Sequence, residues 1–272
     1  MATFKVIVAK LNKRSFIPAQ FPESGGIAGV VNQDFTFQGT EVTSVPNASL
    51  GKWYRDGDGY YYWGNALMQL PTPVQSKKVI LDQTLSDFYT KLFDVCVVHP
   101  QFTHAIDAII EIAVTNQNRY QTVATALGGK IPWYFIAIIH NMEASQNFKK
   151  HLHNGDPLTA RTVHVPANRP AAGTPPFTWE QSAEDALTLE GIQKKTEWAL
   201  ADILYTMEGY NGWGYHIYHP TVNTPYLWSG SNNYVKGKYG ADGKWDADLV
   251  SVQIGGAVIL KRMVEKGIVV IP

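Results

Sequence analysis

Residues 131–162 read IPWYFIAIIHNMEASQNFKKHLHNGDPLTART, and they carry the clearest structural signals in the larger, C-terminal part of the chain. Pro132 predicts the start of an apolar helix that runs to about Ala144, because the first turn of a helix tolerates a residue without an N–H group. The run 154–157, Asn-Gly-Asp-Pro, predicts a turn soon after that helix ends. The stretch therefore predicts a helical domain whose polar residues gather where a helix gives way to a turn.

Apolar residues recur with helical spacing on both sides of this stretch. Helices are predicted around 85–93, over 106–114, 117–127 and 198–207, and as one long final helix over 249–266. Thr178 and Gln181 form a capping-box pattern that predicts a further helix start. The segments 163–176 and 215–248 are rich in Gly, Pro and Asn and are predicted to be long loops, which in compact domains are usually functional.

The N-terminal region, residues 1–70, has a different pattern of short β segments separated by Gly and Pro. The run 56–59, Asp-Gly-Asp-Gly, predicts the turn of a hairpin between two aromatic strands. The predicted strands lie at 4–8, 29–31, 35–37, 41–45, 53–55 and 60–63. Their close spacing predicts a small all-β barrel, and the polar, Pro-bearing run 71–78 is predicted to be a linker to a mainly α domain over 79–272. The predicted fold class is thus α+β with two domains.

The composition excludes some classes of partner. Lys and Arg (23) balance Asp and Glu (23), which argues against nucleic acid, because its binding usually requires a basic face. No apolar run approaches the length of a membrane span, so no membrane partner is expected. Aromatic residues make up 12% of the chain, a content that suits either cores or a sugar-binding cleft.

Cysteine usage and the first residues bear on the compartment. The single cysteine, Cys96, lies in an apolar run and is predicted to be a buried structural thiol. The chain does not open with a basic and then apolar leader after Met1, so synthesis in the cytoplasm without a signal peptide is expected.

Two carboxylates carry the chemistry. Glu143 falls at the end of the apolar helix, where burial and the negative end of the helix dipole both raise the pKa of a carboxyl group, as a general acid requires. Asp156, thirteen positions later in sequence, falls in the Asn-Gly-Asp-Pro turn, where a polar, exposed setting would keep it ionised. Two carboxylates in contrasting environments are the pattern for glycoside cleavage.

Four N-terminal blocks resemble the bacterial SH3 domain. They are Leu11-Asn12-Lys13-Arg14-Ser15, Ile27-Ala28-Gly29-Val30-Val31, Lys52-Trp53-Tyr54-Arg55 and Gly59-Tyr60-Tyr61-Tyr62-Trp63. The sequence departs from that family at Phe16-Ile17, where Gly-Pro is usual. The resemblance implies a small barrel that binds wall peptide or glycan; a structural module without ligand is the alternative.

The C-terminal part resembles the goose-type lysozyme and lytic transglycosylase superfamily, and more closely a bacterial and phage lysozyme family. The residues that carry the resemblance are His140-Asn141-Met142-Glu143-Ala144-Ser145, His153 to Thr162, Tyr210 to Tyr215 and Thr224 to Ser229. The resemblance implies a lysozyme-like domain with Glu143 as the catalytic acid. Asp156 as the second carboxylate carries over less directly, because these superfamilies differ most at that residue.

The resemblance implies a muramidase that cleaves the MurNAc–GlcNAc β-1,4 bond of peptidoglycan glycan strands without a cofactor. Asp156, or water held by Thr159 and Thr162, would serve the face opposite Glu143. The substrate-binding residues it implies are Ser145, Thr159, Thr162, Tyr210, Asn211, Trp213, Tyr226 and Trp228. Such a protein would act at the bacterial cell wall after release or after delivery by a phage or injection machine.

Several of these residues have more than one interpretation. Asp156 is equally well explained as the residue of an Asx turn. Tyr210 and Asn211 could form a helix cap. The aromatic residues Trp213, Tyr226 and Trp228 could equally be core residues. A metal held by His140, Glu143, His151 and His153 is a weaker interpretation, because the spacing matches no standard metal motif; no metal is predicted. Glu180, Glu184 and Asp185 are predicted to form a solvated helix face.

The function also stays open between several classes. A lytic transglycosylase would use Glu143 as acid and then base and would release a 1,6-anhydro sugar. An inert wall-binding protein, or an enzyme that acts on chitin or chitosan, would fit the same sequence.

Overall fold

The computed structural model describes residues 2–70, 79–241 and 243–272. The described chain is α+β, as predicted, with a β-sheet in its N-terminal region followed by a mainly helical region. It divides into two compact units, one made of residues 1–91 with 216–221 and the other of residues 92–215 with 222–272. The predicted linker, 71–78, lies outside the described residues.

The first unit is built on a seven-stranded antiparallel sheet with the strand order β3-β2-β6-β5-β4-β1-β7. The strands are β1 (Ala2–Val6), β2 (Lys10–Arg14), β3 (Ile27–Asn32), β4 (Thr36–Glu41), β5 (Trp53–Asp56), β6 (Tyr61–Trp63) and β7 (Leu67–Gln69), with short 3-10 turns η1 (Ala48–Leu50) and η2 (Gly64–Ala66). The core of the sheet is mostly apolar and includes the buried side chains of Phe4, Val6, Leu11, Phe37 and Tyr62.

The predicted hairpin turn is confirmed. Asp56 caps it, because its carboxylate accepts hydrogen bonds from the Tyr60 backbone N–H at 2.8 Å and from the Tyr62 hydroxyl at 2.9 Å. The strand predicted over 41–45 is wrong, since β4 ends at Glu41. The sequence pattern predicts no strand at β2 or β7, because their residues alternate weakly and their pairing partners lie far along the chain.

The helices are α1 (Gln83–Asp94), α2 (Thr103–Thr115), α3 (Gln117–Ala126), α4 (Trp133–Ala144), α5 (Trp179–Leu189), α6 (Leu200–Asn211), α7 (Gly214–Tyr218), α8 (Pro225–Trp228) and α9 (Gly256–Glu265), with 3-10 turns η3 (Pro100–Phe102) and η4 (Ile192–Lys194). Pro132 is the N-cap of α4, close to its predicted place. Thr178 and Gln181 form the predicted capping box of α5.

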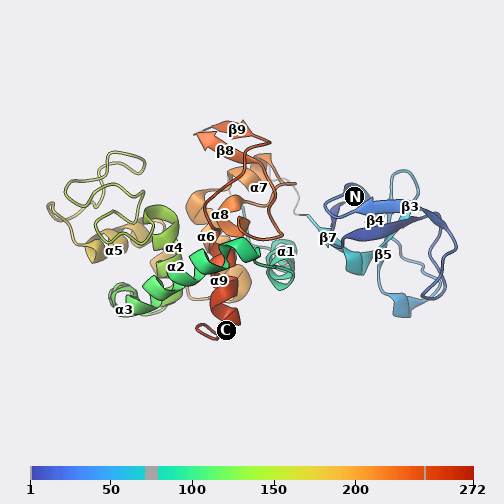
Figure 1. The fold of residues 1–272 in the computed structure, drawn as a ribbon, viewed down its shortest axis with the longest axis horizontal. Coiled ribbons are helices and arrows are strands. Elements are labelled where there is room, and N and C mark those ends of the chain that lie inside the picture. The colour runs from blue at the N-terminus through green and yellow to red at the C-terminus, as the bar shows by residue number, and fades with distance from the viewer. Residues whose placement is uncertain (1, 71–78, 242) are drawn as a thin grey trace. The chain divides into compact units, whose positions relative to one another are not determined.

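In the second unit α4 is the central helix, with every residue from Tyr134 to His140 buried, and it packs against α2, α3 and α9. Figure 1 shows α2 passing beside α4 and α9. Cys96 is buried, as predicted, and burial raises the pKa of its thiol. Among the helices of the described residues, none combines the length and the apolar character needed to cross a bilayer.

Two predictions about the C-terminal region are wrong in detail. The final helix begins at Gly256 rather than near residue 249, because Gly255 runs in extended conformation directly against α8. A Cβ atom at Gly255 would lie 2.3 Å from the backbone of Leu227, so only glycine permits this approach. The predicted loop 215–248 instead contains α8 and a hairpin of β8 (Lys238–Ala241) and β9 (Lys244–Asp246).

Candidate active site

Glu143 lies in the last turn of α4, which ends in a tightly held left-handed bend. Ser145 is the C-cap with a φ of 50°, and its N–H donates to the Asn141 carbonyl. The Gln253 side chain donates to the Met142 carbonyl at 2.7 Å. The contact from Gln253 satisfies a carbonyl group that the end of the helix would otherwise leave without an internal partner, and the two contacts together hold the backbone on either side of Glu143.

The carboxyl group of Glu143 is poorly hydrated. Burial raises its pKa to about 7, and the charge of Glu190 also acts to raise it. The Tyr226 hydroxyl donates a hydrogen bond to Glu143 Oε1 at 2.8 Å, which acts in the opposite direction by favouring the carboxylate. Near neutral pH Glu143 is therefore divided between its acid and its carboxylate form, in the direction that its apolar helix predicts.

Two tyrosines border this carboxyl group. Burial and the charge of Glu143 keep the pKa of both the Tyr226 and the Tyr210 phenols well above the ordinary value, so both remain hydrogen-bond donors. Tyr210, in the last turn of α6, donates to the Leu152 carbonyl at 3.1 Å. It thereby joins α6 to the segment that leads into the Asp156 turn.

Asp156 lies in a contrasting environment. It is 7% exposed, so the prediction of an exposed turn residue is wrong. Burial alone would raise its pKa, but the imidazole of His164 and the backbone N–H groups of His164 and Val163 outweigh burial and lower the pKa to about 2. The contacts are 2.6 Å from His164 Nδ1 to Oδ1, and 2.8 Å and 3.1 Å from the N–H groups of Val163 and His164 to Oδ2.

The turn around Asp156 packs against the end of α4. The Asx turn in it is made by Asn154, whose side-chain oxygen accepts from the Asp156 N–H at 3.1 Å. Gly155 has a φ of +76°, and a Cβ atom there would lie 2.8 Å from the Glu143 carbonyl oxygen. The structure therefore brings the turn close to Glu143, although the Asp156 carboxylate is occupied by its own loop.

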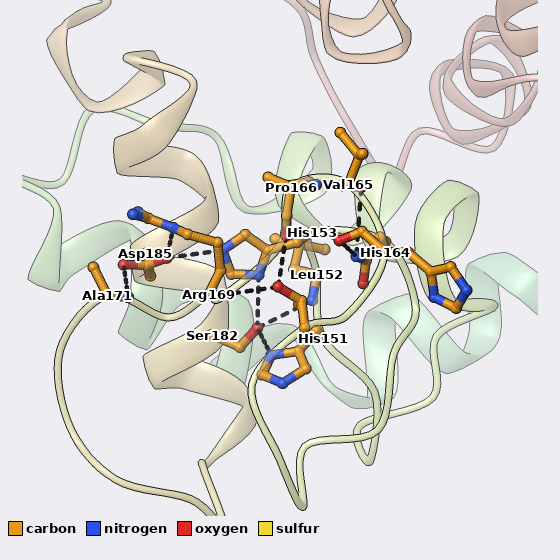
Figure 2. Close-up of polar contacts among 12 residues, drawn as sticks. His151, Leu152, His153, His164, Val165, Pro166, Arg169, Ala171, Ser182 and Asp185 are labelled. Atoms are coloured by element: carbon orange, nitrogen blue, oxygen red, sulfur yellow. Dashed lines mark hydrogen bonds and ion pairs between the residues drawn. The ribbon is translucent and has the colours of Figure 1, made fainter. Parts of the chain in front are cut away.

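A buried polar network anchors this loop to α5, as Figure 2 shows. Ser182 Oγ lies 2.9 Å from His151 Nδ1 and 3.4 Å from His153 Nδ1. His153 Nε2 lies 2.8 Å from Asp185 Oδ2, and Arg169 pairs with the same oxygen at 2.8 Å. Residues on both sides of Asp156 are thus fixed to one helix.

The sequence of contacts Ser182–His153–Asp185 resembles a nucleophilic triad, but its environment shows a structural role. Ser182 is fully buried, and its hydroxyl also accepts the Leu152 N–H at 3.2 Å. Asp185 is predicted to be solvated; instead its side chain is 15% exposed and bonded to His153, Arg169 and Ala171. Burial lowers the pKa of His153 despite the opposing effect of Asp185, so this imidazole favours its neutral form.

The residues of the weaker metal interpretation do not meet at one point, although His151 and His153 both contact Ser182. His140 Nδ1 lies 3.1 Å from the Tyr120 hydroxyl, in a fully buried position, and His151 bonds Ser182 and the Ala160 carbonyl. Across the part of the chain that the structure describes, three or more His, Cys, Asp or Glu side chains do not gather as a metal site would require.

The remaining predicted binding residues divide by exposure. Ser145, Thr159 and Asn211 are exposed, and Tyr210 and Trp213 are partly buried. Thr162 is 2% exposed, and its hydroxyl bonds the Pro166 carbonyl at 2.6 Å and the Arg169 N–H at 2.9 Å, so it organises the loop. Trp228 is 1% exposed, which leaves core packing as its role.

The first unit carries a pocket of about 550 Å³ that is lined by residues of β2 and β5. Its walls include the aromatic side chains of Phe21, Trp53 and Trp63. Arg14 lines the pocket and donates to the Gly25 and Glu23 carbonyls at 2.7 and 2.8 Å, which holds the loop over it. Arg14, Trp53 and Trp63 all belong to the N-terminal sequence blocks quoted above.

Sequence reasoning missed His164, Glu190 and Gln253 as neighbours of the predicted carboxylates. His164 lies in the Pro-rich loop, where no periodic pattern identifies a partner, and Gln253 reaches α4 from 111 positions away. Neither a scan against protein-family models nor searches of the curated proteins and of the solved structures finds a match to this chain.

Proposed function

We propose that this protein cleaves the MurNAc–GlcNAc β-1,4 bond of peptidoglycan, with Glu143 as the general acid. The observation that carries the proposal is the setting of Glu143: a carboxyl group at the end of a buried helix, bonded to Tyr226 and with a pKa raised to about 7. A glycosidic oxygen needs a proton as its bond to the anomeric carbon breaks, and an acid of this pKa still holds one near neutral pH. The second unit would form a lysozyme-like domain around Glu143.

The first unit would be an SH3-like domain that holds the enzyme on the bacterial cell wall. The aromatic pocket formed by Phe21, Trp53 and Trp63 supports this role, because an aromatic lining suits the apolar faces of a cell-wall peptide or glycan. Delivery to the wall would depend on release from the cell or on a phage or injection machine.

A lytic transglycosylase is the second candidate, and the contacts of Asp156 favour it. The Asp156 carboxylate accepts three hydrogen bonds from its own loop and is not free to act directly on substrate. In a transglycosylase Glu143 would serve first as acid and then as base, and the C6 hydroxyl of the sugar would attack in place of water.

Product analysis separates these functions. Purified full-length protein would be incubated with peptidoglycan sacculi, and the soluble products analysed by mass spectrometry before and after borohydride reduction. A muramidase gives reducing-end muropeptides that borohydride reduces. A transglycosylase gives 1,6-anhydro products, lighter by one water and not reduced. Absence of release from sacculi, with release from chitin or chitosan, would move the proposal to another glycan, and binding without release would indicate an inert wall-binding protein.

A further inference from the structure

His164 and Asp156 form an oriented pair at the surface of the second unit. The imidazole Nδ1 lies 2.6 Å from Asp156 Oδ1, within hydrogen-bond distance. The other carboxylate oxygen accepts both the Val163 and the His164 backbone N–H. The carboxylate is therefore held from two directions and in turn holds the ring.

The opposite edge of the imidazole faces solvent. The His164 side chain is 77% exposed, while that of Asp156 is 9% exposed. Within the described residues the structure gives His164 Nε2 no hydrogen-bond partner. A carboxylate that binds Nδ1–H fixes the tautomer in which Nε2 carries a lone pair and accepts a proton.

The pair lies on the turn that touches the end of α4. Gly155, next to Asp156, packs against the carbonyl of Glu143, and Asn154 donates to the His164 carbonyl at 3.0 Å. The network of His151, Ser182 and Asp185 fixes the chain on either side (Figure 2). The loop thus has the rigidity that a positioned catalytic group requires.

The side chains next to His164 in the sequence are of a kind that suits contact with a sugar. Val163 and Val165, the neighbours of His164 in the sequence, are 75% and 89% exposed, so both place apolar surface in water next to it along the chain. Apolar groups beside a polar group suit a pyranose ring, which presents C–H faces and hydroxyl edges.

We propose that His164 is the general base of the hydrolysis and that Asp156 is its positioning residue; this inference rests on the proposed glycan cleavage. Glu143 gives its proton to the glycosidic oxygen as the C1–O bond breaks. Water attacks C1 from the other face, and its proton passes to His164 Nε2. The products are two sugar ends, and solvent exchange returns one proton to Glu143 and removes one from His164. This single displacement inverts the configuration at C1.

The test uses the full-length protein, peptidoglycan glycan strands and the variants H164A and H164Q. We expect both variants to lower kcat at least ~100-fold with little change in KM, and added imidazole to restore part of the H164A rate in proportion to its concentration. His104, an exposed histidine of α2, provides the matched control H104A. Circular dichroism melting checks that each variant is folded. Proton NMR of the first wild-type product should show the α anomer.

The outcomes separate the inference from the proposed function. Unchanged kcat in H164A and H164Q, or a loss that imidazole does not restore, would overturn the role of His164 while leaving Glu143 as the acid. A β-anomer or 1,6-anhydro product from wild type would do the same. Absence of any cleavage by wild type would remove the proposed function and the inference with it.

Discussion

The end of α4 and the loop over residues 154–164 each carry a carboxyl group that is partly or wholly removed from water, yet the two groups differ in charge. Glu143 accepts a side-chain hydrogen bond from Tyr226, and its pKa rises to about 7. Asp156 accepts three hydrogen bonds within its loop, and its pKa falls to about 2. Both groups experience desolvation, so burial alone does not decide the protonation state. The number of hydrogen-bond donors around each carboxyl group decides which protonation state is favoured.

This difference assigns different tasks to the two regions. A carboxyl group that keeps its proton near pH 7 is able to give it away, whereas one that is ionised across the physiological range serves to hold other groups in place. Substitutions at each region and at its hydrogen-bond partners therefore have different expected effects.

The largest effect is expected for E143Q. Glutamine keeps the volume and part of the hydrogen bonding to Tyr226 but has no proton to transfer, so glycan cleavage should fall by at least ~100-fold. The release of muropeptides from sacculi measures the loss. The matched control is E111Q, at an exposed glutamate of α2, which should keep the wild-type rate. Near-wild-type cleavage by E143Q would end the assignment of the acid.

D156N should weaken the fold as well as the activity. The NH₂ group of an asparagine would face one of the N–H groups that now donate to the Asp156 carboxylate, and that hydrogen bond would be lost. We therefore expect the free energy of unfolding to fall by about 1–3 kcal/mol at pH 7. Because the folded-state pKa of Asp156 is lowered, its contribution is complete above the ordinary pKa of an aspartate and is lost as the pH falls through about 2.

Denaturant unfolding of D156N and wild type from pH 7 to pH 2 measures this effect. The difference between the two proteins should shrink toward the acid end of that range. The exposed Asp94, at the end of α1, gives the control D94N, for which little change is expected. A difference that stays constant with pH would show that the charge of Asp156 is not what stabilises the loop.

Y226F should move the pH dependence of catalysis. The Tyr226 hydroxyl favours the carboxylate form of Glu143, so its removal should raise the pKa of Glu143 further. The acid form then persists to higher pH, and the alkaline limb of the kcat profile should shift upward in pH. Profiles of kcat against pH for wild type and Y226F provide the measurement. A downward shift would contradict the direction of this hydrogen bond.

The smallest effect is expected for E190Q, and it has the opposite sign. The charge of Glu190 helps to raise the pKa of Glu143, so its removal should lower that pKa and move the alkaline limb of the kcat profile to lower pH. The shift should be smaller than that of Y226F and should diminish as salt is added, because it acts through charge alone. Equal shifts at low and high salt would argue for a structural cause.

Local patterns predicted a large part of the fold. The capping box of Thr178, the proline that starts α4 and the turn over 56–59 all appear where the sequence places them. These features depend on residues a few positions apart, and their physical chemistry is local. The errors occur where distant segments meet: Gly255 against α8 shortens α9, and hairpin pairing creates β8 and β9.

The same division holds at the candidate site. Residues 131–144 alone predict Glu143 at the end of a buried helix and the direction of its pKa shift, because an apolar helix and its dipole are properties of consecutive residues. Tertiary structure alone decided that Tyr226, 83 positions later, bonds Glu143, and that Asp156 is committed to His164. The reason is that one hydrogen bond depends on donors brought to within about 3 Å, and for segments far apart in sequence only the packed chain sets that distance.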